Sequence, residues 1–286
     1  MLGLTVRDVV FVHSLTMPHL IRWHARTHAH NADEFEFHYF LGGAGSFKNG
    51  TTVHSVERGM LFFTPPQRRH AIRPGALREP ISYYAVLFAV DADSDLAAVL
   101  RSVEFAAAFP AHVGTRRRVL FEEIKNKFGH VNRYHRQAGV LRLAAFIYDL
   151  YAGVTSRNRV PEVSDEYNLH VERLLALFQR DIGKRAKLRD FASELGITPE
   201  HVIRVFRDRF DMTPMHYYRR LKMEAASSFL LNTTMAVKEV AWQVGFSNPY
   251  QFSSAFKEYS GMSPSLFRDR YYQSNPTGYS MRVLPE

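Results

Sequence analysis

Two stretches near the C-terminus share one pattern: LRDFASELGITPEHVIRVFRDRF at residues 188–210 and VKEVAWQVGFSNPYQFSSAFKEY at residues 237–259. Each has a short amphipathic segment with an alanine, then a glycine, then a second segment ending on an apolar-Phe-basic-acidic step. The small alanine lets two helices cross closely, and the glycine permits the left-handed turn between them. The repeat therefore predicts two helix-turn-helix modules in tandem, an arrangement typical of DNA binding.

The second segment of each copy begins with helix-capping signals. Thr198 before Pro199, and Asn248 before Pro249, indicate an N-cap followed by proline at the first helical position. One face of each predicted helix is apolar, and another carries mostly polar residues at spacings of three and four. These polar-face residues are Glu200, Ile203, Arg204 and Arg207 in the first copy, and Tyr250, Ser253, Ser254 and Lys257 in the second.

We expect these faces to contact DNA. An Arg pairs bidentately with guanine, a Glu accepts from cytosine, and an Ile contacts the thymine methyl group. The expected base-reading residues are Glu200, Ile203, Arg204, Pro249, Tyr250, Ser253 and Ser254. The expected phosphate contacts are Arg207, Lys238 and Lys257, aided by the helix N-termini at Ala236 and Pro249.

The stretch GFSNPYQFSSAFKEYSGMSPSLFR, residues 245–268, resembles the signature of AraC-type (AraC/XylS) transcription regulators. Residues 169–270 resemble that family's whole DNA-binding domain. The resemblance implies that residues 214–231 form a long helix joining the two modules, which dock in successive turns of the major groove. Many family members carry Arg where Ser254 stands, so the second module is expected to read bases less strongly.

Length and composition agree with a two-domain regulator. The chain has 286 residues, which exceeds the usual size of one domain. It has no cysteine, which excludes a disulfide framework and thiolate chemistry. Its net charge of +9 favours a polyanionic partner. The first 20 residues include Arg7, Asp8 and His13 and lack the apolar core of a signal peptide. No apolar run approaches membrane-spanning length. We therefore expect a cytoplasmic protein with no membrane partner.

The N-terminal half has short β-rich runs broken by Gly and Pro, at residues 9–12, 34–41, 53–57, 59–64 and 81–90. Such a pattern predicts a sandwich or a small barrel. The order of His28-x-His30, an acidic strand, Gly43-x-Gly45, and then His70 resembles the cupin jelly roll, which AraC-type regulators often carry as their effector domain. The expected fold is thus two-domain: an N-terminal all-β cupin-like jelly roll with following helices, and a C-terminal all-α domain.

The histidines suggest a metal site. The cupin resemblance implies His28, His30, Glu34 and His70 as ligands, a set that suits Zn, Ni, Mn or Fe. Glu34 fits the spacing from the two histidines, but Glu36 fits the spacing to Gly43 better. The cupin pattern has one glutamate ligand, so both alignments cannot hold. Gln67 also replaces the glycine usual in the second motif. The alternative is that these residues bind no metal and line a pocket or hydrogen-bond to strand ends.

The same residues sketch an effector pocket. The inward-facing candidates are His28, His30, Glu36, His38, Phe40, Phe62, His70 and Tyr84. Aromatic rings with donors and acceptors suit a small polar ligand such as a sugar, while a core of satisfied histidines gives the same pattern.

Helices are expected at residues 115–128 and 133–151, where apolar residues recur at helical spacing. The family resemblance implies that the second pairs with its copy in a homodimer; the alternative is that it packs on the barrel. The expected organisation is a ligand-binding domain at residues 1–110, a helical segment at 111–153, a linker at 154–166, a DNA-binding domain at 167–272 and a tail at 273–286.

Three function classes fit the chain. The first is an effector-responsive transcription regulator that binds an operator in double-stranded DNA and acts with RNA polymerase. The second is a metal-dependent cupin enzyme fused to a DNA-binding domain, and the third is an architectural DNA-binding protein. No catalytic triad, phosphate-binding Gly loop or Walker motif supports other chemistry. We therefore expect a regulator and no enzyme.

Overall fold

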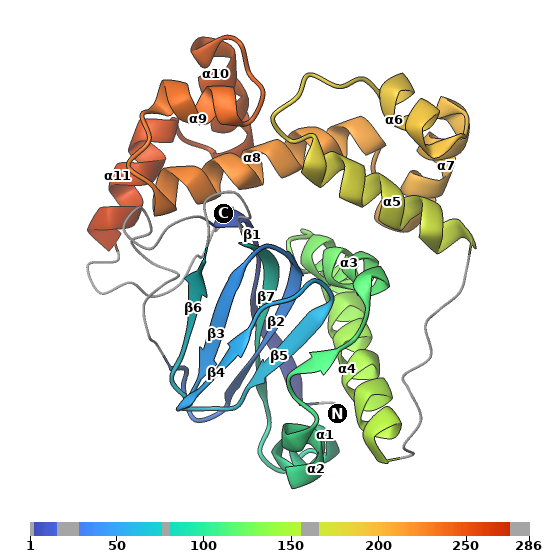
Figure 1. Cartoon of the computed structure of the whole chain (residues 1–286), viewed down its shortest axis with the longest axis vertical. Helices are drawn as coiled ribbons and strands as arrows, with labels where there is room; N and C mark the ends of the chain where they lie inside the picture. Colours follow the sequence, from blue (N-terminus) through green and yellow to red (C-terminus); the bar gives the residue numbers. More distant parts are fainter. Residues whose placement is uncertain (1–2, 16–28, 76–80, 156–165, 275–286) are drawn as a thin grey trace. The chain divides into compact units, whose positions relative to one another are not determined.

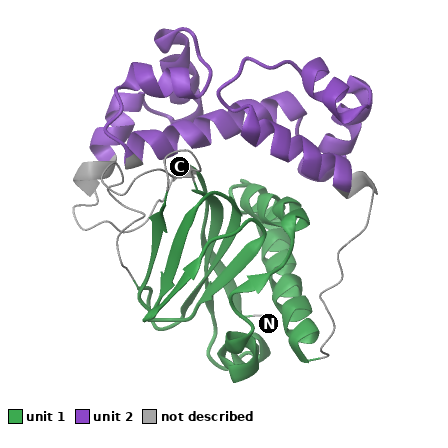
Figure 2. Ribbon diagram, viewed as in Figure 1, with its two compact units in different colours: residues 1–18, 24–163 green, residues 19–23, 164–286 purple. Residues whose placement is uncertain are grey.

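The computed structural model describes residues 3–15, 29–75, 81–155 and 166–274. These residues form two compact units, an N-terminal unit that ends before residue 164 and a C-terminal unit that follows (Figure 2). Most of the expected linker, residues 154–166, lies outside the described residues, and so does most of the expected tail.

The N-terminal unit is built from two antiparallel sheets. Their strands are β1 (Leu4–Leu15), β2 (Glu34–Gly42), β3 (Gly45–Asn49), β4 (Thr52–Ser55), β5 (Met60–Thr64), β6 (His70–Pro74), β7 (Ile81–Val90) and β8 (Ala111–His112). The larger sheet has the order β1-β7-β2-β5-β8, and the smaller sheet has the order β4-β3-β6. The central strands β2 and β7 are buried on both faces. This explains the nearly unbroken apolar run of β7, whereas β2 also carries Glu34, Glu36 and His38.

Helices cover the outer face of the larger sheet (Figure 1). They are α1 (Asp95–Arg101), α2 (Val103–Ala107), the short 3-10 helix η2 (Thr115–Arg117), α3 (Arg118–Phe128) and α4 (Arg133–Thr155). Tyr39 of β2 stacks on Phe121 of α3 at a ring-centre distance of 4.6 Å, and Phe37 meets Phe146 of α4 edge-on. Each side chain of β2 therefore faces either the helices or the smaller sheet, according to its parity.

The strands β3 and β6 lie outside the β-rich runs predicted from the sequence. Both strands are short and contain turn-type residues at their ends, Gly45 and Pro74, which pair with each other. A Cβ on Gly45 would lie 2.4 Å from the carbonyl oxygen of Arg73, so this glycine permits a close strand approach that any larger residue would prevent. Gly45 and Pro74 therefore lie where β3 and β6 approach each other closely. Tertiary packing here outweighs the local turn preference of these residues.

Within the described part of the chain, α4 is the one helix long and apolar enough to cross a membrane, judged by length and composition alone. A core helix of a soluble protein meets the same criterion. One side of α4 packs into the N-terminal unit through Leu143, Phe146 and Ile147. Its apolar character reflects an exposed apolar stripe added to a buried one, and the absence of a membrane partner stays a prediction.

The C-terminal unit consists of helices only. They are α5 (Glu166–Arg180), α6 (Leu188–Leu195), α7 (Pro199–Phe210), α8 (Pro214–Asn232), α9 (Val237–Gln243), α10 (Pro249–Ser260) and α11 (Pro264–Ser274). The helix α8 runs between a first module of α5–α7 and a second module of α9–α11 (Figure 1). The predicted tandem helix-turn-helix arrangement and the two-domain fold are confirmed.

The predicted capping signals set the start of both second helices. The Thr198 side chain accepts a hydrogen bond from the amide of His201 at 3.2 Å, and the Asn248 side chain accepts one from Tyr250 at 2.8 Å. Gly196 ends α6 with a φ of +71°, a conformation that a β-carbon disfavours. Because these interactions join residues only two to four apart, the sequence is enough to specify them.

Candidate functional sites: two recognition helices and a buried histidine–glutamate cluster

The helix α7 presents the predicted polar face to solvent. Glu200, Arg204 and Arg207 are exposed, while Ile203 is half-buried beside them. Arg204 is partly oriented, since its Nη2 lies 3.0 Å from Nδ1 of His201 one turn earlier. The opposite face buries Val202, Val205, Phe206 and Phe210 in the first module. The helix thus offers an acid, an apolar group and two guanidinium groups on one exposed surface.

The helix α10 offers a less charged surface. The Tyr250 side chain is 83% exposed, and Ser254 and Lys257 are also exposed. Ser253 donates its hydroxyl proton to the carbonyl of Pro249 at 2.9 Å, so its oxygen is left mainly as an acceptor. Pro249 is half-buried. These properties agree with weaker base reading by the second module, and the individual base contacts of both helices stay predictions.

The helix N-termini expected near phosphate already have internal partners. The carboxylate of Glu239 accepts from the amide of Ala236 at 2.6 Å, and Asn248 caps α10. The dipolar contribution to phosphate binding is therefore shared with protein groups at both ends. Lys238, Arg207 and Lys257 are exposed, and their phosphate contacts stay predictions.

Replacement of Lys257 by Ala is expected to weaken binding by a similar factor on all DNA sequences and to lower the salt slope of log Kd by about one. The reason is that a phosphate contact releases a counterion and carries no sequence information. Fluorescence anisotropy on specific and unrelated duplexes over a salt series measures both quantities. Arg101→Ala, which removes one exposed positive charge from the N-terminal unit, is the control. A loss confined to the specific duplex would instead assign Lys257 to base reading.

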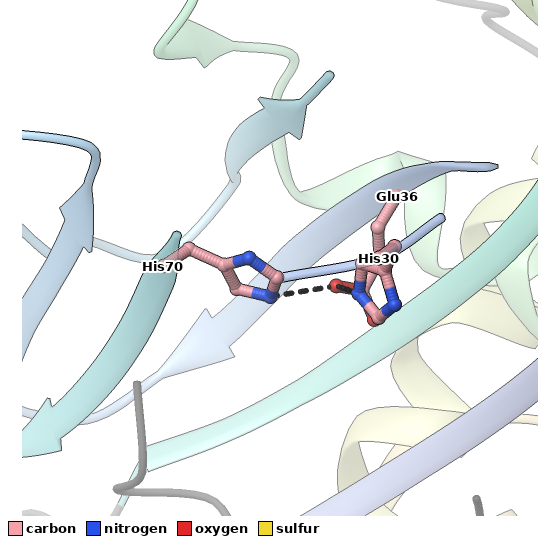
Figure 3. A group of neighbouring side chains, drawn as sticks. All are labelled: His30, Glu36 and His70. Carbon is pink, nitrogen blue, oxygen red and sulfur yellow. Dashed lines mark hydrogen bonds and ion pairs between the residues drawn. The ribbon is translucent and has the colours of Figure 1, made fainter. Parts of the chain in front are cut away.

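A second candidate site lies between the two sheets of the N-terminal unit (Figure 3). Oε2 of Glu36, on β2, lies 2.8 Å from Nε2 of His30, which precedes the strand. Nε2 of His70, at the start of β6 in the other sheet, lies 2.9 Å from the same oxygen. Nε2 of His38 lies 3.6 Å from it. Three imidazoles thus converge on one carboxylate oxygen, and Glu36, His38 and His70 are buried.

The cluster holds Glu36 in its ionised form. Burial alone would raise the pKa of Glu36, but the charge of His38 and the hydrogen bonds of His30 and His70 outweigh it and hold the pKa well below its usual value. Burial would likewise lower the pKa of His30, but the Glu36 carboxylate raises it above the usual value. Burial and then the Glu36 charge raise the pKa of Tyr83, so that its phenol stays protonated.

The structure selects between the two candidate carboxylates. The carboxylate of Glu34 accepts hydrogen bonds from the backbone and the side chain of Asn31, at 3.1 and 2.9 Å, while Glu36 joins His30 and His70. The metal set expected with Glu34 is therefore corrected to one with Glu36. Residues 29–33 form no strand, and residues 32 and 33 lie in a turn, which breaks the simple parity argument between His30 and Glu34. His28 lies outside the described residues.

Most of the remaining pocket candidates share the side of Glu36. Phe40 and Phe62 are buried there and pack around Phe47, with ring centres of Phe47 and Phe62 4.5 Å apart. The side of Tyr84 is corrected: it pairs with Tyr39 across the sheet, and its hydroxyl donates to Glu122 of α3. Its neighbour Tyr83 faces the cluster and was missed. Because β7 is apolar on both faces, only its pairing register reveals which tyrosine points inward.

Each of the two units matches a known protein family. The family described as the AraC-like ligand binding domain matches residues 18–137, and a helix-turn-helix domain family matches residues 191–270. The transcriptional activator AarP of Providencia stuartii is 32% identical over 116 residues, which are 41% of this chain and 82% of AarP. The chain belongs to the AraC-type transcription regulators.

Two relatives align with most of this AraC-type regulator. The Msm operon regulatory protein of Streptococcus mutans is 23% identical over 239 residues, 82% of this chain and 84% of the relative. The raffinose operon transcriptional regulatory protein RafR of Pediococcus pentosaceus is 21% identical over 242 residues, 82% of this chain and 85% of the relative. The AraC-type regulator is thus a DNA-binding transcription factor whose N-terminal unit is an effector domain.

Proposed function

We propose that this AraC-type regulator binds a sugar, or a similar polyhydroxyl compound, at the cluster of His30, Glu36, His38 and His70, and that the effector changes its action at an operator. The observation that carries the proposal is the Glu36 carboxylate, on whose Oε2 three imidazole nitrogens converge in a largely buried site. A carboxylate accepts and an imidazole donates or accepts, which matches the hydroxyl groups of a sugar. RafR aligns with most of this chain, and its name connects that relative with the sugar raffinose.

We also propose that the cluster can hold a divalent cation. Nε2 of His30, Nε2 of His70 and Oε2 of Glu36 lie within 4.8 Å of one another, and His38 supplies a further nitrogen nearby. Such separations fit ligands about 2.0–2.2 Å from one first-row ion, and nitrogen-rich sets suit Zn, Ni, Fe or Mn. A bound cation would supply a positive charge that polarises an effector hydroxyl. The chain's own groups would then orient the effector and exclude water.

The experiment that tests both ideas uses the full-length protein. Elemental analysis after purification measures bound metal, and a thermal-shift screen with mono- and oligosaccharides, with and without added Zn²⁺ or Ni²⁺, measures effector binding. A sugar that raises the melting temperature in a concentration-dependent way supports the proposal. A screen in which non-sugar metabolites alone stabilise the protein would overturn the assignment of a sugar. Metal below one tenth of an equivalent, with no response to added metal, would overturn the cation site.

We infer that the regulator is not an enzyme, works in the cytoplasm and acts through RNA polymerase. The relatives AarP, Msm regulator and RafR all have names of transcription regulators, and that supports the inference. The cupin-enzyme alternative predicts turnover of the bound compound. Incubation of the metal-loaded protein with a stabilising sugar, followed by mass analysis of the sugar, tests this, and chemical change in step with time would contradict the inference.

We propose that the regulator forms a homodimer through the exposed side of α4. Tyr134, Leu141 and Tyr148 are 68%, 49% and 38% exposed, at spacings of seven residues. The stripe between them is continued by Ala138, Ala145 and Ala152. Alternating spacings of four and three with small residues suit a helix pairing with a second copy of itself. This stripe of α4 lies opposite the side that packs into the N-terminal unit.

Replacement of Leu141 by Glu is expected to weaken dimerisation at least about 100-fold, because each copy loses an apolar contact worth about 1.5–3 kcal/mol and gains a charge. Sedimentation equilibrium of the full chain measures the dissociation constant. Val103→Glu is the matched control, since Val103 is 80% exposed on α2 and away from the stripe. An unchanged dimer in Leu141→Glu would place the interface elsewhere.

A further inference from the structure

One lysine of the connecting helix α8 lies at the junction of the two helix-turn-helix modules. Lys222 is 7% exposed and thus buried, which is uncommon for a lysine. Its Nζ donates to the carbonyls of Ile182 and Lys184, which follow α5 in the first module, the latter at 2.8 Å. It also donates to the carbonyl of Val244, at the end of α9 in the second module, at 2.8 Å. All three N–H groups of the ammonium therefore have a carbonyl partner.

The backbones of the two modules touch at the same point. A Cβ on Gly245 would lie 2.7 Å from the carbonyl oxygen of Gly183 and 2.8 Å from Nζ of Lys222. A Cβ on Gly183 would lie 3.0 Å from the carbonyl oxygen of Gln243. Direct backbone contact leaves no flexible side chain between the modules to absorb movement. The glycine of the second turn thus serves the junction as well as the turn, where its φ is +78°.

Other groups hold the first-module side of the junction in place. Tyr218, one turn before Lys222 on α8, donates its hydroxyl to the carbonyls of Asp181 and Lys184. Nζ of Lys222 lies 4.7 Å from the centre of the Tyr218 ring, a favourable cation–π distance. Burial lowers the pKa of Lys222 to about 8, although the Asp181 carboxylate opposes the shift, so most of the lysine is still charged at pH 7.

The energetics favour one relative placement of the modules. A buried ammonium is costly by several kcal/mol unless each donor is paired, and here the pairing needs groups from both modules at once. Rotation or separation of either module would remove one or more of the three carbonyl partners from the buried Lys222 ammonium. Base reading by α7 and α10 needs such a fixed placement, because successive base pairs are about 3.4 Å apart along the duplex.

We propose that Lys222, together with Gly183 and Gly245, fixes the separation and rotation of the two recognition helices and so determines the spacing of the two half-sites in the operator. The proposal rests on the use of α7 and α10 in DNA binding. Lys222 is a positioning residue, since it contacts no DNA itself and acts through the modules that it joins.

The first test measures spacing preference. A duplex selected from a random DNA library by the wild-type full-length protein is compared with versions that have one base pair inserted or removed between the half-sites. The wild type is expected to lose at least about tenfold in affinity on the altered spacers, since one mismatched position costs about 1–3 kcal/mol. Lys222→Met is expected to bring this ratio to within about threefold of one. The matched control is Lys187→Met, an exposed lysine of the first module, and it should keep the wild-type ratio.

The second test needs no DNA. The chain has no cysteine, so Asp208→Cys and Ser265→Cys, both at exposed positions in different modules, accept one spin label each. Pulsed electron resonance should give one narrow distance distribution in the parent and a broad one with Lys222→Met. Gly183→Ala leaves every charge intact and should shift the mean of the distance distribution or broaden the distribution. If Lys222→Met fails to fold, the Gly183→Ala result alone decides the test.

Two results would overturn the proposal: an unchanged distance distribution in Gly183→Ala and Lys222→Met, or a wild-type spacing ratio in Lys222→Met. If the parent protein selects no DNA at all, its DNA-binding role fails, while the label distances still decide whether the junction is rigid.

Discussion

Arg204→Ala should cost about 1–3 kcal/mol of binding free energy at the specific operator, a loss of roughly 5- to 150-fold, and relax the preference at one base pair. Arg204 is exposed on the polar face of α7, and its guanidinium is partly oriented by His201. A planar fork of donors fits the two acceptors on the major-groove edge of guanine. Anisotropy titrations against the operator and its single-base variants measure both the loss and the position.

The control for Arg204 is Arg209→Ala on the same helix. Arg209 is exposed at the end of α7, about half a turn away from the Arg204 face, so its removal takes away an equal charge. We expect it to leave the order of preference among operator variants unchanged. A wild-type preference at every base pair in Arg204→Ala would contradict the base-reading role.

Glu36→Ala is expected to lower the free energy of unfolding of the N-terminal unit by about 3–5 kcal/mol and to abolish the effector response. Removal of one partner from a buried ionic cluster leaves the others uncompensated, and here three imidazoles lose the shared carboxylate. Urea unfolding of the full chain, monitored by far-ultraviolet circular dichroism, measures the free energy of unfolding. The thermal shift with the stabilising sugar measures the response.

Glu34→Ala is the matched control, two residues earlier in the same strand. Its carboxylate is partly exposed and bonds only to Asn31 in the described structure, so a loss of about 1 kcal/mol or less is expected. A full effector response in Glu36→Ala would show that the effector binds elsewhere.

The helices and exposed faces of the DNA-binding half could be predicted from the sequence, because they depend on residues close together in the chain. The caps at Thr198 and Asn248 act over two or three residues. The apolar stripe of α7 follows from helical periodicity, and the repeat reports the same fold twice. The family signature then added the identity of the long helix, which the structure places at Pro214–Asn232.

The effector half was readable only in outline. Glu36 was one of two candidates, and its selection depends on a loop at residues 29–33 that breaks the extended parity. His70 joins the cluster from the other sheet, which no spacing within one strand can specify. Tyr83 and Tyr84 were exchanged because a strand buried on both faces carries no alternation of apolar and polar residues.

The sequence by itself determined the class of the protein, the two modules and the faces of α7 and α10, since each depends on residues a few positions apart. Tertiary structure alone decided which carboxylate gathers the histidines and that Lys222 joins both modules. In the sequence Lys222 is one basic residue in a helix rich in them. Its role depends on three carbonyls from residues 182, 184 and 244, which only the folded chain brings to one ammonium.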